Sequence, residues 1–239
     1  MNLPASTKTV AAALLVGSSL ALAGCATGPD RDPRDPLEPF NRAAYSFNEM
    51  VDRIVLEPLA QGYQAITPAP VDKGVTNFFN NLADLRSAVN NLLQFKIGRA
   101  FSDVGRFAVN STVGFLGLMD VASNMDLPRY NEDFGQTLGV WGVGSGPYIV
   151  LPFFGPSSGR DGVGVVVDWF TDPVMLVEDD AVRWGLRGLK LIDTRADLLG
   201  ASRVLDQAAL DPYAFVRDAY LQQRQSAVYD GNPPEELFE

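Results

Sequence analysis

The residues available for chemistry are few, because this chain of 239 residues contains one cysteine and no histidine. The lack of histidine excludes Ser-His-Asp and Cys-His nucleophile pairs, HExxH zinc sites and imidazole proton shuttles. The formal net charge of −10 argues against nucleic acid as a partner, since phosphate binding depends on clustered Lys and Arg. We therefore expect no catalytic residue, no metal site and no cofactor.

One serine-containing segment resembles a catalytic motif. Residues 155–159, with the sequence GPSSG, match the G-x-S-x-G pattern of a nucleophile elbow. That elbow needs a preceding strand, a following helix and a histidine base later in the chain. A Ser-Lys dyad would have to use Lys73, Lys96 or Lys190, and none of these has a telling spacing. We interpret the segment as a Pro/Gly turn in which a serine caps the next helix.

A glycine-rich segment and two acidic pairs are further candidates. Residues 142–146 (GVGSG) resemble a phosphate-binding loop, but they lack the last glycine of the dinucleotide motif and no Lys-Ser/Thr follows. Adjacent carboxylates such as Glu132-Asp133 and Asp179-Asp180 rarely face one substrate, and we interpret them as solvated or helix-start charges. A glycosidase-like carboxylate pair remains an open alternative.

The single cysteine, Cys25, follows a short apolar segment. Lys8 is the one charge before it, and an apolar run over residues 10–23 leads into Leu-Ala-Gly-Cys. These features predict a secretory signal over residues 1–24, too short for a transmembrane helix. The ending resembles a bacterial lipobox, whose cysteine is acylated and becomes the new N-terminus. Because Ala26 follows instead of aspartate, the resemblance favours a protein lipid-anchored to the outer membrane and facing the periplasm.

Replacing Cys25 with serine should abolish lipidation and leave an uncleaved or soluble product, because serine offers no thiol. Each buried CH₂ contributes roughly 0.8 kcal/mol, and two or more acyl chains hold a protein durably on a membrane, so their loss should release it. Metabolic labelling with palmitate, followed by membrane fractionation, measures this. Palmitate labelling of the Cys25→Ser variant would show that the lipobox assignment is wrong.

The rest of the chain predicts a mostly α fold in a single domain, with no sustained strand pattern. Apolar residues recur at steps of three and four from Leu37 to Ile54, until Pro58 interrupts the helix. Asp35-Pro36 and Asp211-Pro212 are typical helix starts, with an aspartate cap before a first-turn proline. Further helices are expected over about residues 71–93, 97–109, 158–170, 178–199 and 211–227. The expected organisation is a lipidated flexible tether over 25–34, a helical domain over 35–228 and a disordered acidic tail over 229–239.

Residues 134–154 form an apolar, glycine-rich segment without charges. Glycine is costly to order, so we predict that residues 131–146 form a mobile hairpin that acts as a gate, with its apolar side chains resting in lipid. The candidate channel or gate residues are Phe134, Gly135, Gly139, Trp141, Gly142, Gly144 and Gly146. The alternative is that these glycines only allow close packing against neighbouring helices.

Six stretches beyond the lipobox, which follow one another in order along nearly all of the mature chain, carry a resemblance. They are DPLEPFNRAAYSFN (35–48), NFFNNL (77–82), VNNLLQ (89–94), RFAVNSTVGFLGLMDVA (106–122), EDFGQTLGVWGVGSGPYIVLPFFGPSSGRD (132–161) and DPYAFVRDAYLQQR (211–224). In these stretches the chain resembles the MlaA (VacJ) family of phospholipid-handling outer-membrane lipoproteins. The resemblance implies a helical ring at the outer membrane, with an amphipathic channel through it.

The same resemblance implies a function and partners. Phospholipids misplaced in the outer leaflet would enter the channel and pass to a periplasmic lipid carrier, which returns them to an inner-membrane ABC transporter. This traffic maintains the lipid asymmetry of the outer membrane, and the family associates with a trimeric outer-membrane porin. Two alternatives stay open: a periplasm-facing lipoprotein hydrolase, and a structural lipoprotein that scaffolds a membrane machine without moving lipid.

Overall fold

The computed structural model describes residues 32–234, and most of them belong to helices. The elements are α2 (Glu38–Val51), η1 (Asp52–Leu56), α3 (Glu57–Ile66), α4 (Ala69–Leu93), α5 (Ile97–Thr112), η2 (Ala122–Met125), α6 (Phe134–Val140), β1 (Tyr148–Leu151), β2 (Gly155–Ser158), α7 (Gly159–Thr171), η3 (Pro173–Leu176), α8 (Asp180–Ala208) and α9 (Pro212–Val228). The predicted mostly α fold is confirmed. The signal segment and Cys25 lie outside the described residues.

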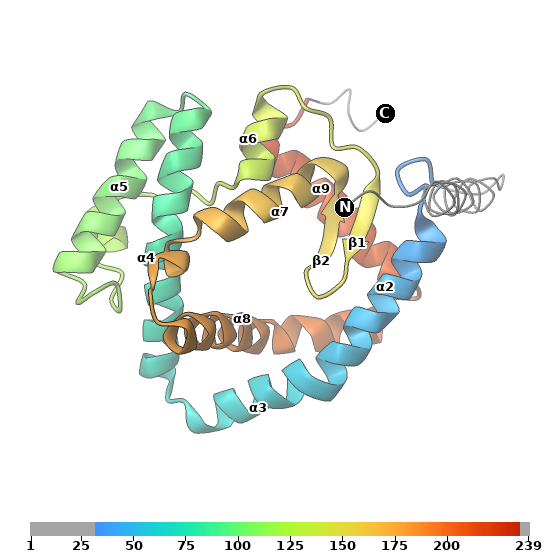
Figure 1. The fold of residues 1–239 in the computed structure, drawn as a ribbon, viewed down its shortest axis with the longest axis horizontal. Coiled ribbons are helices and arrows are strands. Elements are labelled where there is room, and N and C mark those ends of the chain that lie inside the picture. Colours follow the sequence, from blue (N-terminus) through green and yellow to red (C-terminus); the bar gives the residue numbers. More distant parts are fainter. Residues whose placement is uncertain (1–31, 235–239) are drawn as a thin grey trace, which may run out of the picture.

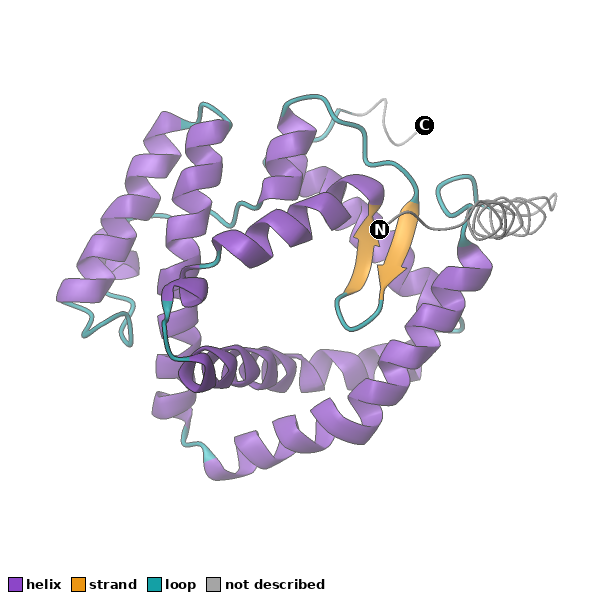
Figure 2. Ribbon diagram, viewed as in Figure 1, coloured by secondary structure: helices purple, strands orange, loops and turns teal. Residues whose placement is uncertain are grey.

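The helices form a ring around a central space (Figures 1 and 2). One side of the ring consists of α2, η1 and α3, the opposite side is α4, and α8 lies against α3. The ring is closed by α7 and the β1–β2 hairpin, while α5 packs on the outer side of α4 (Figure 1). The predicted helical ring is therefore confirmed. Within residues 32–234, no helix combines the length and apolarity needed to cross a membrane.

Aspartate and serine caps set the starts of several helices. Asp211 accepts a hydrogen bond from the backbone N–H of Ala214 at 3.2 Å, and Asp179 accepts one from Val182 at 2.9 Å. These contacts satisfy backbone donors that the first helical turn leaves unpaired. The predicted helix start at Asp211-Pro212 is confirmed, and so is the interpretation of Asp179-Asp180 as helix-start charges.

The predicted helix start at Asp35-Pro36 is wrong. The first helix begins three residues later, at Glu38, with Pro39 in its first turn. Asp35 is instead fully buried, where its carboxylate accepts hydrogen bonds from the Asn41 side chain at 2.7 Å and from the Tyr213 hydroxyl. The Asp35 carboxylate therefore binds a side chain of α9 and does not cap the first turn of a helix.

Pro58 does not end the first helix as the sequence predicts. It lies in the first turn of α3, which follows α2 directly through the π-helical turn η1. Proline has no N–H to donate to the carbonyl oxygen of the preceding helical turn. The wider π-helical turn before Pro58 accommodates this missing hydrogen bond, so the helical path continues. The chain therefore follows one side of the ring continuously from Glu38 to Ile66.

The mobile hairpin predicted over residues 131–146 is placed wrongly, because Phe134–Val140 form helix α6. Its cap, Asp133, accepts a hydrogen bond from the backbone N–H of Gln136 at 2.9 Å. The hairpin of this structure comes next, where β1 pairs antiparallel with β2 and Tyr148 lies opposite Ser158. Strands of four residues are too short to show a clear alternation in sequence, so the pattern gave no signal.

Both ends of the predicted helical domain extend slightly further than expected. Asp32 and Arg34, predicted to belong to the tether, form ion pairs with α9 residues: Arg217 contacts Asp32 at 3.1 Å and Asp218 contacts Arg34 at 2.9 Å. Asp230, predicted to belong to the tail, pairs with Lys96 at 2.6 Å. Charge pairing between segments far apart in sequence fixes these residues.

The contact between α4 and α5 buries polar side chains, while many apolar side chains of these two helices are exposed. Across the contact between α4 and α5, the buried polar side chains are Asn81, Asp84, Ser87, Asn90, Asn91, Asp103, Arg106 and Asn110. Along the same two helices, the exposed apolar side chains include Val71, Val89, Leu92, Phe101 and Val104. Soluble domains bury their large apolar residues, so this distribution is inverted.

Candidate functional site

Two cavities lie at the inner wall of the ring. The first, which we call the α8 cavity, has a volume of about 450 Å³ and is lined by α2, η1, the hairpin and α8. The second, the α7 cavity, has a volume of about 340 Å³ and is lined by α4, α7 and α9. Phe154 and Pro156 of the hairpin line both, so the cavities are neighbours. Volumes of 300–1,000 Å³ are typical of ligand sites.

The α8 cavity combines an ion pair with apolar walls. The Arg195 guanidinium of α8 donates two hydrogen bonds to the Asp52 carboxylate, at 2.7 and 2.8 Å. Leu56, Leu191 and Leu198 line the same space. A cavity of this kind can contact a charged group and a hydrocarbon chain at once.

The α7 cavity contains a cluster of buried charges centred on Arg224 of α9. Its guanidinium pairs with Asp133 at 2.5 Å and with Asp161 at 3.0 Å, and the Tyr220 hydroxyl donates to Asp161 at 2.8 Å. Burial acts to raise the pKa of Asp161, but hydrogen bonds from Arg224 and Arg160 outweigh burial and lower that pKa to about 2. The cluster therefore holds charge on both carboxylates and joins α6, α7 and α9.

The lowered pKa of Asp161 predicts a loss of stability in acid. A carboxyl group with a lowered folded-state pKa stabilises the fold above its unfolded pKa and loses that effect as the pH falls through the folded value. A shift from 3.8 to about 2 corresponds to about 2 kcal/mol, which should be lost between about pH 5 and pH 2. Denaturant titrations of the detergent-solubilised protein across this range measure the loss. Asp161→Asn should flatten the dependence, and an equally steep curve in that variant would contradict the assignment.

The predicted gate residues lie outside both cavities, since none of the seven lines either space. Gly135 and Gly139 of α6 are packing positions. A Cβ on Gly135 would lie 2.6 Å from Asp161 Oδ1, and one on Gly139 would lie 2.7 Å from Val228. The other three glycines follow α6: Gly142 and Gly146 have positive φ angles of 89° and 68°, and Gly144 has open space around it.

The two aromatic gate candidates contact each other at the ends of α6. The rings of Phe134 and Trp141 meet edge to face with centroids 6.2 Å apart, and the Trp141 indole N–H donates to the carbonyl oxygen of Leu93 at 2.9 Å. The indole is half exposed. This contact joins the turn after α6 to the end of α4.

Glu132 and Asp133 are not a solvated pair. Glu132 is 4% exposed and accepts a hydrogen bond from the Gln94 side chain at 2.9 Å, which corrects the prediction of surface charge. Asp133 is the helix-start charge that the sequence suggested, as the cap of α6. Each carboxylate binds its own partner within the protein, so we interpret both as residues that stabilise the fold.

Ser157 lies within β2, one residue before its end, and α7 follows the strand directly, so the local order of strand and helix resembles that of a nucleophile elbow. The histidine that such an elbow requires is absent from the sequence. The Ser157 hydroxyl is buried, donates a long hydrogen bond of 3.5 Å to the carbonyl oxygen of Ser158 and interacts with the Tyr220 hydroxyl. The cap of α7 is Ser158, which accepts from the backbone N–H of Asp161 at 3.1 Å. The prediction of a serine cap is confirmed, and the capping residue is the second serine.

Ser157→Ala should leave lipid handling unchanged, because no base can activate the hydroxyl and the cap is its neighbour. Ser158→Ala should lower the free energy of unfolding by about 1 kcal/mol through loss of the cap. Chemical denaturation and a lipid-asymmetry assay of both variants provide the measurement. Loss of function in a folded, membrane-bound Ser157→Ala variant would instead favour a hydrolase.

Sequence reasoning missed the residues that line the α7 cavity. Arg86, Asp161, Asp168, Tyr220 and Arg224 come from three helices widely separated in the chain. One signal was present: Arg217, Tyr220 and Arg224 recur at steps of three and four along α9. Polar residues at the spacing of a buried helix face indicate a polar interior.

Comparison with known proteins identifies the family. The sequence profile described as "MlaA lipoprotein" matches residues 33–227. The "Intermembrane phospholipid transport system lipoprotein MlaA" of Haemophilus influenzae is 37% identical over 241 residues, which cover 94% of this chain and 92% of that protein. The Escherichia coli protein of the same name is 39% identical over 224 residues, which cover 88% and 85% of the two chains.

A solved structure agrees with the sequence comparison. It comes from work described as "Structural basis for maintenance of bacterial outer membrane lipid asymmetry", and it matches with a TM-score of 0.71 and 35% identity. The match covers 83% of this chain and 100% of the other. Family profile, relatives and fold agree over the same ring of helices, and the chain therefore belongs to the MlaA lipoprotein family.

Proposed function

We propose that this protein removes misplaced phospholipids from the outer leaflet of the outer membrane through the opening of its ring and passes them to a periplasmic carrier. The observation that carries the proposal is the inverted distribution of side chains along α4 and α5, which bury charged and polar groups between them and expose large apolar residues. A surface of that kind is suited to lipid, since hydrocarbon solvates apolar side chains without cost. The relatives named for intermembrane phospholipid transport support the same function.

The lining of the two cavities supports a path for an amphipathic molecule. A phospholipid crosses a bilayer slowly because its charged headgroup is expensive to place in hydrocarbon. The α8 cavity offers the Arg195–Asp52 pair beside leucine side chains, and the α7 cavity offers buried charges beside Trp169. A headgroup moving along these charges would stay solvated by the protein while its tails remain in an apolar phase. Such a path needs no nucleophile, metal or nucleotide.

The location and partners follow from this function. The acylated Cys25 would hold the ring at the outer membrane, facing the periplasm. The exposed apolar side chains of α4 and α5 would lie in lipid or against a trimeric porin. A soluble periplasmic carrier would then take each lipid towards an inner-membrane ABC transporter.

A surface-labelling experiment tests the proposed function. Cells lacking this protein should expose more phosphatidylethanolamine to a membrane-impermeant amine reagent than cells that carry it. The gene supplied on a plasmid should restore the low labelling. Equal labelling of both strains would overturn the proposal, and turnover of lipid by the purified protein would point to a hydrolase instead.

We propose the gate in a narrower form than the sequence suggested, as the turn over residues 141–147. The turn contains Gly142, Gly144 and Gly146, which leave it without bulky side chains at three positions, and its far end leads into the hairpin that lines both cavities. Backbone hydrogen bonds from Gly159 to Pro147 and from Arg160 to Ser145 hold the turn against α7, and opening the gate would break them. Cysteines at Val140 and on α4 near Leu93 should block lipid passage when oxidised and restore it when reduced. The variant with a cysteine at Val140 alone is the control. Unchanged passage after confirmed crosslinking would eliminate the gate.

A further inference from the structure

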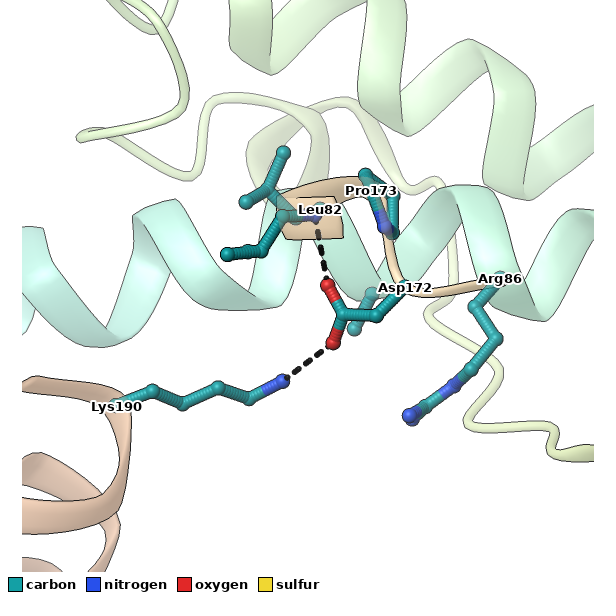
Figure 3. A pocket seen from close by; sticks show the side chains of 7 residues that line it. Leu82, Arg86, Asp172, Pro173 and Lys190 are labelled. Carbon is teal, nitrogen blue, oxygen red and sulfur yellow. Dashed lines mark hydrogen bonds and ion pairs between the residues drawn. The ribbon is translucent and has the colours of Figure 1, made fainter. Parts of the chain in front are cut away.

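Arg86 of α4 lies at the junction of the α7 cavity and a small neighbouring hollow of about 10 Å³. Its Nε is buried and donates no hydrogen bond, and its guanidinium forms no ion pair within residues 32–234. Figure 3 shows this wall from close by: Lys190 reaches Asp172 at 3.5 Å, while no interaction with the residues drawn reaches Arg86. A buried N–H group without an acceptor destabilises the fold, and a ligand that accepts its hydrogen bond would remove that cost.

The other charged groups of this cavity already have ionic partners, with one exception. Asp133 and Asp161 pair with Arg224, and Asp172 pairs with Lys190. The exception is Asp168 of α7, which accepts only the backbone N–H of Phe134, at 3.2 Å, and forms no ion pair within the described part of the chain. The cavity therefore contains one cationic and one anionic side chain that are not joined by a hydrogen bond.

The positive charge of Arg86 acts electrostatically on the Asp168 carboxylate. Burial raises the pKa of Asp168, and the nearby charge of Arg86 partly offsets that rise. An ionised carboxylate accepts hydrogen bonds at several lone pairs, and Asp168 uses few of them. A guanidinium donates from five N–H groups and suits the paired oxygens of a phosphate.

We infer that Arg86 and Asp168 form a headgroup subsite for zwitterionic phospholipids, with the phosphate on Arg86 and the ammonium on Asp168. The inference rests on the proposed function and specifies its substrate class. A phosphoethanolamine headgroup contains one negative and one positive group, which are opposite in sign to the Arg86 and Asp168 side chains that line this cavity. A phosphatidylglycerol headgroup offers the phosphate alone and leaves Asp168 without a cation.

The test uses the full lipidated protein in detergent, incubated with mixed micelles that contain equal amounts of phosphatidylethanolamine and phosphatidylglycerol. Mass spectrometry of the re-purified protein measures total bound phospholipid and the ratio of the two lipids. The wild type should be enriched in phosphatidylethanolamine. Arg86→Met should reduce total bound lipid about tenfold, since a charge-assisted contact is lost. Asp168→Asn should keep most of the lipid and shift the ratio towards parity, and exposed Arg203→Ala is the matched control that should change neither quantity.

Thermal unfolding separates binding from folding. The Arg86 side chain makes no hydrogen bond or ion pair within the described chain, so Arg86→Met should melt no lower than the wild type, and Arg86→Lys should keep part of the binding. Equal lipid binding by wild type and Arg86→Met, or enrichment unaffected by Asp168→Asn, would overturn the subsite while leaving the proposed function intact. Inorganic phosphate at millimolar concentration should not displace the lipid, and displacement would mean a simple anion site. A wild type that binds no phospholipid would instead remove the proposed function itself.

Discussion

Replacing Arg106 with alanine should lower the free energy of unfolding by about 3 kcal/mol, because it leaves the buried Asp84 carboxylate with only Arg129 of its two cationic partners. The side chain is 2% exposed and lies between α4 and α5. Its guanidinium contacts Asp84 at 3.3 Å and Asp120 at 3.0 Å, and it donates to the carbonyl oxygen of Leu127 at 2.8 Å. One residue thus satisfies acceptors from α4 and from the loop around η2.

The consequences differ for the two carboxylates. Asp84 is 1% exposed, and burial already raises its pKa against the opposing charges of Arg129 and Arg106, so losing one cation makes its ionised form still less favourable. Asp120 is more accessible, so water can replace the guanidinium there. The destabilisation should therefore come chiefly from Asp84. It should shrink in Arg106→Ala/Asp84→Asn, where the buried charge is removed as well.

Urea titrations of the detergent-solubilised protein at pH 7 measure these differences. The exposed Arg203→Ala variant is the control for loss of an arginine, and it should change stability by less than about 0.5 kcal/mol. Arg106→Lys should recover only part of the loss, since an ammonium cannot reproduce the fork geometry of the guanidinium. A loss below about 1 kcal/mol in Arg106→Ala would show that the polar contact between α4 and α5 contributes little to the fold.

The sequence predicts the helices well because local signals control their ends. Asp179, Ser158 and Asp211 cap helices within a residue or two of the predicted starts. Prediction of helix starts from neighbouring residues failed where the side chain forms a hydrogen bond with a residue far away in the sequence. The Asp35 carboxylate binds Tyr213 of α9 instead of capping a helix, and no spacing near residue 35 could reveal that contact.

The orientation of the helix faces was not predictable from periodicity. The apolar stripe of α4 includes Phe79, which is buried, but also Val89 and Leu92, which are about half exposed. The same helix buries Asn81 and Asp84 on its other side. Periodicity finds a stripe but does not say whether water, protein or lipid covers it.

The candidate site was less accessible to sequence reasoning than the fold. Arg86 and Asp168 are far apart in the chain, and only closure of the ring brings α4 and α7 to one cavity. Aromatic and glycine-rich composition drew attention to residues 134–146, yet these residues lie outside the cavities. Composition indicates where a segment is unusual, whereas the charges that line a space depend on which helices meet.

Gly164→Ala should lower the free energy of unfolding by about 3 kcal/mol, at the upper end of the range for overpacking a tight contact. An added Cβ would lie 2.5 Å from the backbone nitrogen of Gly135 and 2.8 Å from its Cα. These atoms belong to the main chain of α6, so no side chain can rotate out of the way. The helices α6 and α7 would have to separate, and the Arg224 bridge between Asp133 and Asp161 would be stretched with them.

Gly162→Ala is the matched control, because it lies on the same helix and its Cβ would meet only the Ser157 hydroxyl oxygen, at an ordinary contact distance of 3.7 Å. Alanine is the better helix former, so this variant should be neutral or up to about 1 kcal/mol more stable. Comparing the two by chemical denaturation separates the need for close packing from any general effect of glycine loss. If Gly164→Ala matched Gly162→Ala in stability, α6 would be free to move away from α7, and the gate would then have to include the whole of α6 instead of the turn that follows it.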